Sequence, residues 1–300
     1  MATRFPADAP ALDLPNLGVH ALWAGWFGVL LRAWDAAPVP TRAALLLAGV
    51  ALQFWSYAAL HNHMHVPLAR SRPLRFVLHR TLGLACGFPY RGYHLHHLNH
   101  HRFDNGEGDW GRLRPGEAAL HYCARWALTP WLWPWVALGK VWGAARGRAQ
   151  RLELLLDFAV VDGTVVALLV WRPALGAGYL AGLVVTQGCI HYLNLAAHHG
   201  TDARERTQLA NTSRSRFYNR WFFNAGLHQA HHLRPQLPWR ALEALTRELE
   251  REGRLPVHLT TGLSPLHPAW AARVVRGYDA RACKPPADSR TTPAPPSGAT

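Results

Sequence analysis

Four apolar stretches, each close to 20 residues long, constrain the fold of this 300-residue chain more than any other feature. A helix needs about 20 consecutive apolar residues to cross a bilayer. The stretches are residues 16–34, 43–60, 154–171 and 174–197. Short linkers join the first to the second and the third to the fourth, so each pair can form a hairpin. The sequence therefore predicts an all-α integral membrane protein with about four transmembrane helices in two hairpins.

The basic residues indicate how these helices are oriented. The formal net charge is +14, which could suggest a nucleic-acid-binding protein. However, Lys140 and Lys284 are the only lysines, and the arginines lie between apolar stretches without a recognisable nucleic-acid motif. Arginine-rich loops are typical of the cytoplasmic side of membrane proteins, and the linker at residues 35–41 has no basic residue. We therefore expect no nucleic-acid partner, an external linker, and cytoplasmic termini, including segment 1–15.

The remaining segments are expected to lie beside the membrane rather than to span it. Residues 74–88 are apolar but short, which favours a surface or re-entrant helix. Residues 126–141 contain two prolines and four tryptophans, a composition that argues against a straight span and favours an interfacial segment. Residues 241–253 have the pattern of an exposed amphipathic helix. The expected membrane domain covers residues 16–253, and residues 254–300 form a tail that is predicted to be disordered after Arg281.

Three dense histidine clusters carry the chemistry of the chain. They are His61-Asn62-His63-Met64-His65, Tyr93-His94-Leu95-His96-His97-Leu98-Asn99-His100-His101 and His228-Gln229-Ala230-His231-His232. Neutral imidazole is the commonest metal-ligating side chain. Positions i, i+3 and i+4 lie on one face of a helix, so each cluster can direct a set of imidazoles in one direction. The predicted topology brings all three clusters to the same side of the membrane, where they would form a helical cap.

Nine histidines have the right spacing to act as metal ligands. They are His61, His65, His97, His100, His101, His198, His228, His231 and His232. A structural zinc ion usually takes four ligands, so nine imidazoles favour two metals in a shared cage. Asn194 lies one helical turn before His198 and is a candidate ligand through water. Imidazole suits zinc, copper, nickel and iron, so the residues alone do not choose the metal.

The other histidines and two aspartates receive lesser roles. Four histidines next to the clusters point elsewhere and are expected to be outer hydrogen-bond partners of the ligands: His63, His94, His96 and His199. His191 is expected to be a buried polar residue, although it could contribute a ligand. No role is expected for His20, His79, His121, His258 and His267. Asp157 and Asp162 lie in an apolar stretch, so both should face the interior of the helix bundle.

The three clusters resemble the His boxes of the integral-membrane fatty acid desaturase superfamily, as HxxxH, HxxHH and HxxHH. The second box continues as Arg102-Phe103-Asp104-Asn105-Gly106-Glu107-Gly108-Asp109, and the third as HHLRPQLPW, both similar to the family pattern. The segment from Asn194 to His198 resembles an extra ligand pair of acyl-CoA desaturases. The resemblance covers roughly residues 43–245.

This resemblance implies two iron ions in a non-haem centre that uses O2 to oxidise an unactivated C–H bond. The implied activity is desaturation of a long fatty acyl chain, presented as an acyl-CoA, an acyl-carrier protein or a lipid. Because the sequence contains no haem or flavin module, an external donor such as ferredoxin or cytochrome b5 is expected. Asn105 and Asp109 are expected to orient the histidines of the second box.

Two alternatives remain open. A hydroxylase or ketolase of the same superfamily, such as a carotenoid ketolase, would carry nearly the same boxes. A membrane haem or metal carrier without enzymatic activity would also need histidines, although tandem HxxHH clusters exceed what haem ligation requires.

Overall fold

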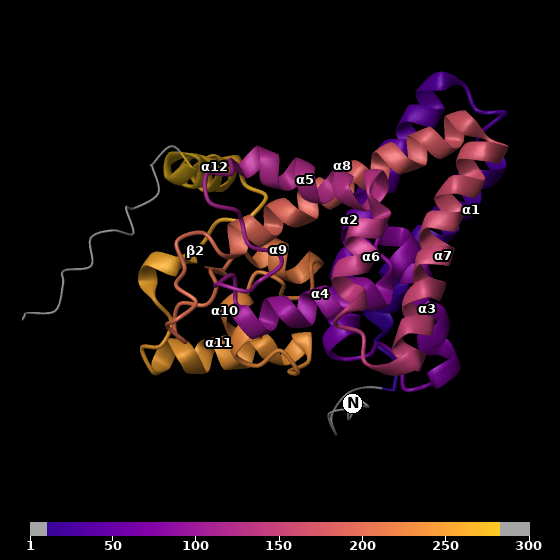
Figure 1. Cartoon of the computed structure of the whole chain (residues 1–300). Coiled ribbons are helices and arrows are strands. Elements are labelled where there is room, and N and C mark those ends of the chain that lie inside the picture. The colour runs from indigo at the N-terminus through magenta and orange to yellow at the C-terminus, as the bar shows by residue number, and fades with distance from the viewer. Residues whose placement is uncertain (1–10, 283–300) are drawn as a thin grey trace, which may run out of the picture.

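The computed structural model describes residues 11–282, and its secondary structure is almost entirely helical (Figure 1). The first eight helices are α1 (Leu14–Ala33), α2 (Val39–His65), α3 (Arg72–Cys86), α4 (Tyr90–Phe103), α5 (Ala119–Leu132), α6 (Pro134–Trp142), α7 (Gly147–Trp171) and α8 (Pro173–Ala197). The remaining elements are β1 (Thr212–Ser213), α9 (Arg216–Trp221), α10 (His228–Leu233), η1 (Trp239–Ala241), α11 (Leu242–Arg251), η2 (Val257–Leu259), β2 (Thr260–Thr261) and α12 (Pro268–Ala282).

Four helices within residues 11–282 are long and apolar enough to cross a membrane, namely α1, α2, α7 and α8. This result confirms the predicted all-α membrane protein with four candidate spans. In sequence, α1 precedes α2 and α7 precedes α8, and the two helices of each pair pack against one another. Apolar residues such as Leu47, Val166 and Val170 are exposed on the outward faces of these helices, as expected for surfaces that contact lipid.

The length of α2 explains how the first histidine cluster leaves the membrane. Its 27 residues correspond to about 40 Å at 1.5 Å per residue, about 10 Å more than the hydrocarbon core of a bilayer. The last turns of α2 carry His61 and His65. The sequence predicted a span that ended at residue 60, whereas the helix continues through the cluster and fixes its orientation.

Helix α8 lies at the centre of the packing, in contact with α2, α5 and α7. Its buried residues include Leu175, Tyr179 and Leu183, which belong to an apolar core shared with α1, α2 and α3. The turn between α7 and α8 is tight. A Cβ atom on Gly176 would come within 2.5 Å of the backbone nitrogen of Leu169, so a residue without a side chain is needed for this close approach.

Helices α3, α5 and α6 match the segments that were predicted not to span. Helix α3 is 15 residues long and is packed between α2 and α7 with Leu78 and Leu82 buried. It begins at the cap residue Ser71 and ends at Gly87, whose φ of 68° stops the helix. The proline-containing segment forms two helices instead of a straight span, because the backbone leaves helical geometry at Trp133 (φ −137°, ψ 62°).

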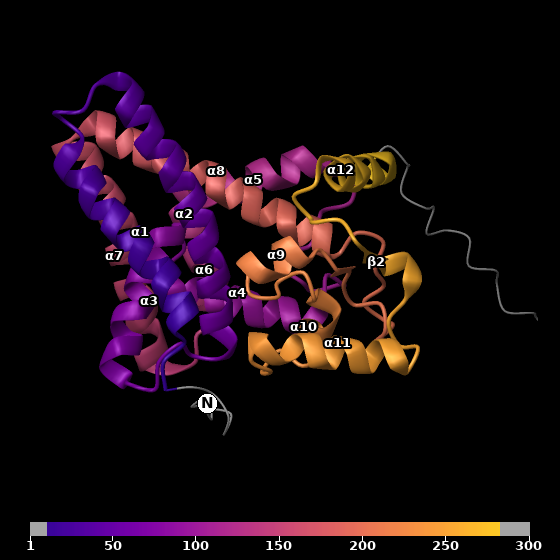
Figure 2. The same cartoon turned by 180° about the vertical axis from the view of Figure 1, so that it is seen from behind.

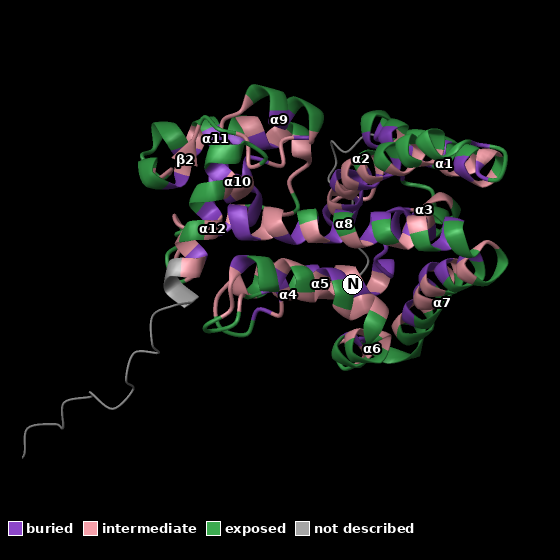
Figure 3. Cartoon of the chain, turned by 90° about the horizontal axis from the view of Figure 1, so that it is seen from above, coloured by how far each residue is buried: buried purple, intermediate pink, exposed green. Residues whose placement is uncertain are grey.

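The polar part of the chain forms a separate region beside the long helices. Figures 1 and 2 show α1, α2, α3 and α7 on one side of the molecule and α9 to α12 on the other, with α4, α5 and α8 running between them. Seen from above, exposed residues follow the outward sides of α6 and α7 (Figure 3). Within this region, β1 and β2 form a two-stranded parallel sheet in which Thr212 pairs with Thr260. Helix α11 buries Leu242, Leu245 and Leu249 on one face, as the amphipathic pattern predicted.

Two predictions concern residues that the structure does not describe. The disorder predicted after Arg281 falls almost wholly on residues 283–300, and the N-terminal segment 1–15 includes residues 1–10. Residues 1–10 and 283–300 lie outside the described residues, and the predicted domain boundaries remain predictions.

Candidate metal centre

Four parts of the chain meet at the histidine clusters. The end of α2 contributes the first cluster, α4 contributes the second, and α10 contributes the third. His198 follows the last residue of α8, and its N–H donates to the carbonyl of Asn194 at 3.2 Å. The side chains of all nine predicted ligands come together at this junction in two adjacent groups.

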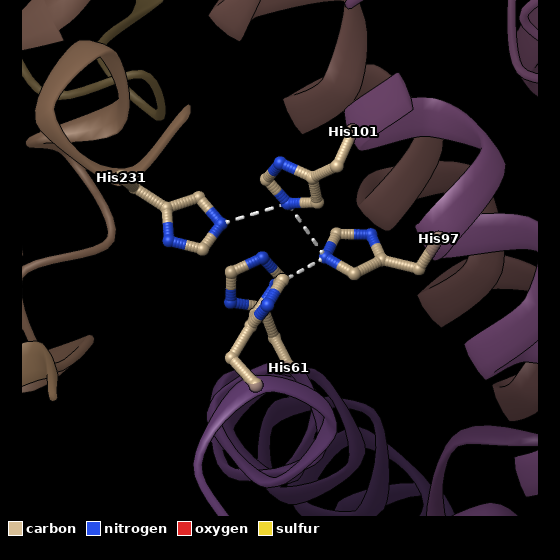
Figure 4. A group of neighbouring side chains, drawn as sticks. His61, His97, His101 and His231 are labelled. Carbon is tan, nitrogen blue, oxygen red and sulfur yellow. Dashed lines mark hydrogen bonds between the residues drawn. The ribbon is translucent and has the colours of Figure 1, made fainter. Parts of the chain in front are cut away.

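Five imidazoles form the first histidine group: His61, His65, His97, His101 and His231. Their ligand nitrogens all lie within 4.8 Å of one another. The Nε2 atom of His97 lies 2.7 Å from Nε2 of His65 and 3.1 Å from Nε2 of His101. The Nε2 atom of His231 is 3.0 Å from that of His101. Figure 4 shows these rings converging from three elements, with His97 and His101 one helical turn apart on α4.

Four imidazoles form the second histidine group: His100, His198, His228 and His232. Here the Nε2 atoms of His100 and His198 lie 3.1 Å apart. The two groups share their helices. On α4, His97 and His101 belong to the first group and His100 to the second. On α10, His231 belongs to the first group, and His228 and His232 belong to the second. The ring centroids of His101 and His232 are 4.4 Å apart, so the two groups are neighbours.

In three of the four histidines of the second group, the outer nitrogen is held by an oxygen atom. The Nδ1 atom of His100 lies 2.6 Å from Oδ2 of Asp109, and Nδ1 of His232 lies 2.6 Å from Oδ1 of Asp104. The Nδ1 atom of His198 lies 2.9 Å from the carbonyl oxygen of Leu209. Carboxylate and carbonyl oxygens accept hydrogen bonds, so each Nδ1 carries the proton. The inward Nε2 atoms therefore present their lone pairs to the interior of the group.

Burial favours the neutral form of several of these imidazoles. Burial lowers the pKa well below the ordinary histidine value in His97, His101, His228, His231 and His232, among others. Burial likewise lowers the pKa of His198 to about 3. A nitrogen that binds a metal must be unprotonated, so these six imidazoles can bind a metal at neutral pH without first losing protons.

The carboxyl of Asp109, in contrast to the neutral imidazoles, is kept in its charged form. Burial alone would raise its pKa, but hydrogen bonds from His100 and from the backbone N–H groups of Gly111 and Asn105 hold the pKa below its usual range. Asp109 is therefore an anion that orients His100, which is the placement that the sequence suggested. Asn105 acts through its backbone, with a φ of 65°, and not through its amide side chain.

The geometry fits bound metal ions. Metal–imidazole bonds are about 2.0–2.1 Å long, so neighbouring ligand nitrogens on one ion lie about 3 Å apart. The separations of 2.7–3.1 Å between Nε2 atoms match this value. In addition, the Nε2 atoms of His61 and His232 are buried and have no hydrogen-bond partner among residues 11–282. A buried polar atom without a partner costs about 1–3 kcal/mol, and coordination would satisfy it.

An aromatic cavity opens beside both groups. Its walls include His61 and His97 of the first group and His100 and His228 of the second. The rest of the wall is largely apolar and aromatic and includes Phe54, Tyr57, Tyr93, Tyr122, Ile190, Leu193, Tyr218, Phe222 and Trp270. Asn194 also lines this cavity, and its Nδ2 atom donates to the hydroxyl of Tyr122 at 2.9 Å.

Several other predicted positions lie apart from the two groups. The Nδ1 atom of His63 accepts from the backbone N–H of Leu68 at 3.0 Å, and His94 lies beside Arg91. The ring of His96 packs against Trp126, with centroids 5.0 Å apart, and the ring of His191 stacks on the same tryptophan. Burial of the His191 side chain agrees with its expected role as a buried polar residue. The ring of His199 lies against Tyr278 of α12.

Sequence reasoning missed three groups that hold the ligands. Asp104 closely follows the second box, and an acidic residue beside a histidine box is a signal from which its role could have been predicted. The carbonyl of Leu209 and the hydroxyl of Tyr122 gave no signal, because neither belongs to a motif. Tyr122 donates to the carbonyl of Gly111 at 2.7 Å, in the loop that also contains Asp109.

Comparison with known proteins supports one family. The sequence matches the model of the fatty acid desaturase family over residues 36–260, about three quarters of the chain. The matched region contains α2, α4, α8 and α10 and thus all nine histidines of the two groups. No individual curated protein matched the sequence. The chain therefore belongs to the fatty acid desaturase family, and with it to the membrane oxidoreductases.

Proposed function

We propose that the protein is a di-iron enzyme that uses O2 to desaturate a long fatty acyl chain. The observation that carries the proposal is the position of the two histidine groups on the wall of the aromatic cavity. Nine inward-facing imidazoles suit two iron ions, and the family favours iron among the metals that imidazole binds. Iron ions held there would supply the activation of O2 needed to oxidise an unactivated C–H bond.

The cavity is suited to an apolar chain. Phe54, Leu193 and Phe222 present apolar surface, and burial of a methylene group against such surface is favourable by about 0.8 kcal/mol. Because His61 belongs to the first group and His100 to the second, a chain in the cavity passes both groups. The walls would hold one stretch of the chain in place and exclude water from it.

Electron balance requires a reductant in addition to the fatty acyl chain. Reduction of O2 to two molecules of water takes four electrons, and formation of one C=C bond supplies two of them together with two protons. The other two electrons must come from a donor such as ferredoxin or cytochrome b5. We place the histidine groups on the cytoplasmic side, where the arginine-rich segments would face such a donor. Opposite charges on the two proteins would speed their encounter.

Product analysis tests the proposal. The protein would be expressed in cells, and their fatty acids compared by mass spectrometry with those from cells expressing His101→Ala. His121→Ala is the matched control, because His121 lies on the exposed face of α5, outside both groups. We expect a product lighter by two hydrogens in the wild type and in His121→Ala only. A product heavier by one oxygen would overturn desaturation in favour of the hydroxylase alternative.

Metal analysis of the purified protein tests the centre itself. We expect about two irons per chain and no haem absorption band. The Nε2 atoms of His65 and His97, at 2.7 Å, and of His100 and His198, at 3.1 Å, are too close together to hold a porphyrin plane between them. A haem band with less than one non-haem iron per chain would contradict the proposed centre.

A further inference from the structure

We propose that Tyr122 is a positioning residue that fixes the direction of the Asn194 amide and steadies the loop behind His100. Tyr122 lies on α5 and is fully buried, with 0% of its surface exposed. Its hydroxyl donates to the carbonyl oxygen of Gly111 at 2.7 Å and accepts from Nδ2 of Asn194 at 2.9 Å. One hydroxyl thus joins α8 to the loop that follows α4.

The number of hydrogens at this hydroxyl determines which way the amide faces. A tyrosine hydroxyl has a single hydrogen, and a carbonyl oxygen can only accept. The hydrogen of Tyr122 is therefore used on Gly111, and the hydroxyl can only accept from Asn194. Asn194 must present its NH2 group to Tyr122, so its Oδ1 atom faces another direction.

The Oδ1 atom of Asn194 is thereby left available as an acceptor. Among residues 11–282 it accepts no hydrogen bond, and Asn194 lines the aromatic cavity together with His97 and His100. An acceptor on this wall can hold a water molecule that ligates a metal in the histidine groups. This step rests on the proposed function, because it assumes that a metal is bound there.

The Tyr122 hydroxyl also supports His100 indirectly, through the loop that contains Asp109. The N–H of Gly111 donates to Oδ1 of Asp109 at 2.7 Å, and Oδ2 of Asp109 lies 2.6 Å from Nδ1 of His100. Four hydrogen bonds therefore link Asn194 to Tyr122, Tyr122 to Gly111, Gly111 to Asp109, and Asp109 to His100. Loss of the Tyr122 hydroxyl would loosen the Asp109 loop and free the Asn194 amide to rotate.

Tyr122→Phe is the direct test, and Tyr179→Phe is its matched control. Tyr179 is also buried, with 1% of its surface exposed, and its hydroxyl donates to the carbonyl of Leu84 at 2.9 Å, between α8 and α3. Both variants lose one buried hydroxyl, but the Tyr179 hydroxyl bonds to α3 instead of to Asn194 and the loop that contains Asp109. The measurement is titration of the metal-free full-length protein with Co²⁺, followed by visible absorption, which reports coordination number as well as affinity.

We expect the wild type and Tyr179→Phe to bind two Co²⁺ ions with the same spectra. In Tyr122→Phe one of the two ions should bind about 10–100-fold more weakly, the range expected when an outer hydrogen-bond partner of a ligand is lost. The spectrum of that ion should also change. Wild-type affinities and spectra in Tyr122→Phe would overturn the inference.

A second variant separates the two actions of Tyr122 and does not depend on the stability of Tyr122→Phe. Asn194→Leu removes the amide but keeps the bond from Tyr122 to Gly111. It should bind both Co²⁺ ions with nearly wild-type affinity while changing the spectrum of one. An unchanged spectrum would contradict the role given to the amide. Failure of the proposed function has a different signature, because the wild type would then form no O2-dependent product, whatever the variants bind.

Discussion

The carboxylate of Asp104 lies 2.6 Å from Nδ1 of His232 and so joins the end of α4 to α10. Asp104 has a positive φ of 48°, and its N–H donates to the carbonyl of His100 as the helix ends. Aspartate tolerates this left-handed conformation better than most residues. The backbone at the end of α4 therefore directs a carboxylate at a histidine that is 128 residues away in the sequence.

Asp104→Asn should weaken metal binding without disturbing the backbone. Asparagine keeps the size of the side chain and tolerates a positive φ, but it removes the negative charge that holds the proton on Nδ1 of His232. We expect a decrease of about 10–100-fold in metal affinity, measured by Co²⁺ titration. Asp202→Asn is the control, because the Asp202 side chain forms an ion pair with the exposed Arg204, two residues later in the chain. Equal losses in the two variants would show that the effect is not specific to His232.

The helical period predicted which imidazoles come together in the structure. His97 and His101 are one turn apart on α4, as are His228 and His232 on α10, so the spacing alone indicates which imidazoles share a face. The long apolar stretches predicted the four candidate spans for a similar reason, since their length is set by the thickness of a bilayer.

Other features depend on contacts between distant segments and could not be read from spacing. The spacing placed His97, His100 and His101 on one face but did not show that His100 joins a different group from its neighbours. That division depends on where α10 and the end of α8 pack against α4. The outer partners include a backbone carbonyl, at Leu209, which every residue possesses and no motif marks.

Replacement of a ligand should abolish activity while the protein still inserts into the membrane. His231→Ala removes one imidazole from the first group, and His100→Ala removes one from the second. Each loss should exceed the effect of changing an outer partner, so we expect activity to fall by more than 100-fold. Product formation and iron content in purified membranes are the measurements.

The choice of control for these variants follows from the structure. The sequence suggested His79 as a silent position, but its ring stacks on Tyr90 with centroids 3.9 Å apart, so its removal affects packing. His121 is exposed and is the better control. Loss of iron in His121→Ala equal to that in His231→Ala would contradict the ligand assignment.

Asp157→Asn should destabilise the protein without removing a ligand. Asp157 is buried in α7, where its Oδ1 atom lies 3.2 Å from Nε of Arg80 and its Oδ2 atom accepts from the N–H of Arg91 at 2.7 Å. These contacts hold α3 and the start of α4 against α7 and confirm that Asp157 faces the bundle interior. Removing one partner of a buried ion pair costs about 3–5 kcal/mol, because the other charge stays buried alone.

A lower melting temperature in detergent would reveal this cost. Glu153→Gln is the control on the same helix, because the side chain of Glu153 is 39% exposed and its ion pair with Arg91 is worth at most about 1 kcal/mol. A melting temperature for Asp157→Asn as high as that of Glu153→Gln would show that the buried pair contributes little.

Both termini should lie in the cytoplasm. The arginines concentrate in the segments on the side of the histidine groups, whereas residues 35–41 carry no basic residue. A reporter enzyme fused after Thr300 should therefore be active only in the cytoplasm, and one inserted at Ala37 only outside. The reverse pattern would place the histidine groups outside the cell and would remove a cytoplasmic electron donor from the proposal.

The adjacent residues His198 and His199 should respond in opposite ways to the same substitution. The Nε2 atom of His198 lies 3.1 Å from that of His100 in the second group, and its Nδ1 atom is held by the carbonyl of Leu209. The ring of His199 lies instead against Tyr278 of α12. We expect His198→Ala to lose or weaken one of two irons and to abolish turnover, because the second group has only three imidazoles left. His199→Ala should keep both irons, although its melting temperature should fall as the contact with α12 is lost. Iron counting on the two purified variants gives the answer directly. Iron loss in His199→Ala, with both irons retained in His198→Ala, would mean that the end of α8 is rotated relative to the structure and that the second group must be redrawn.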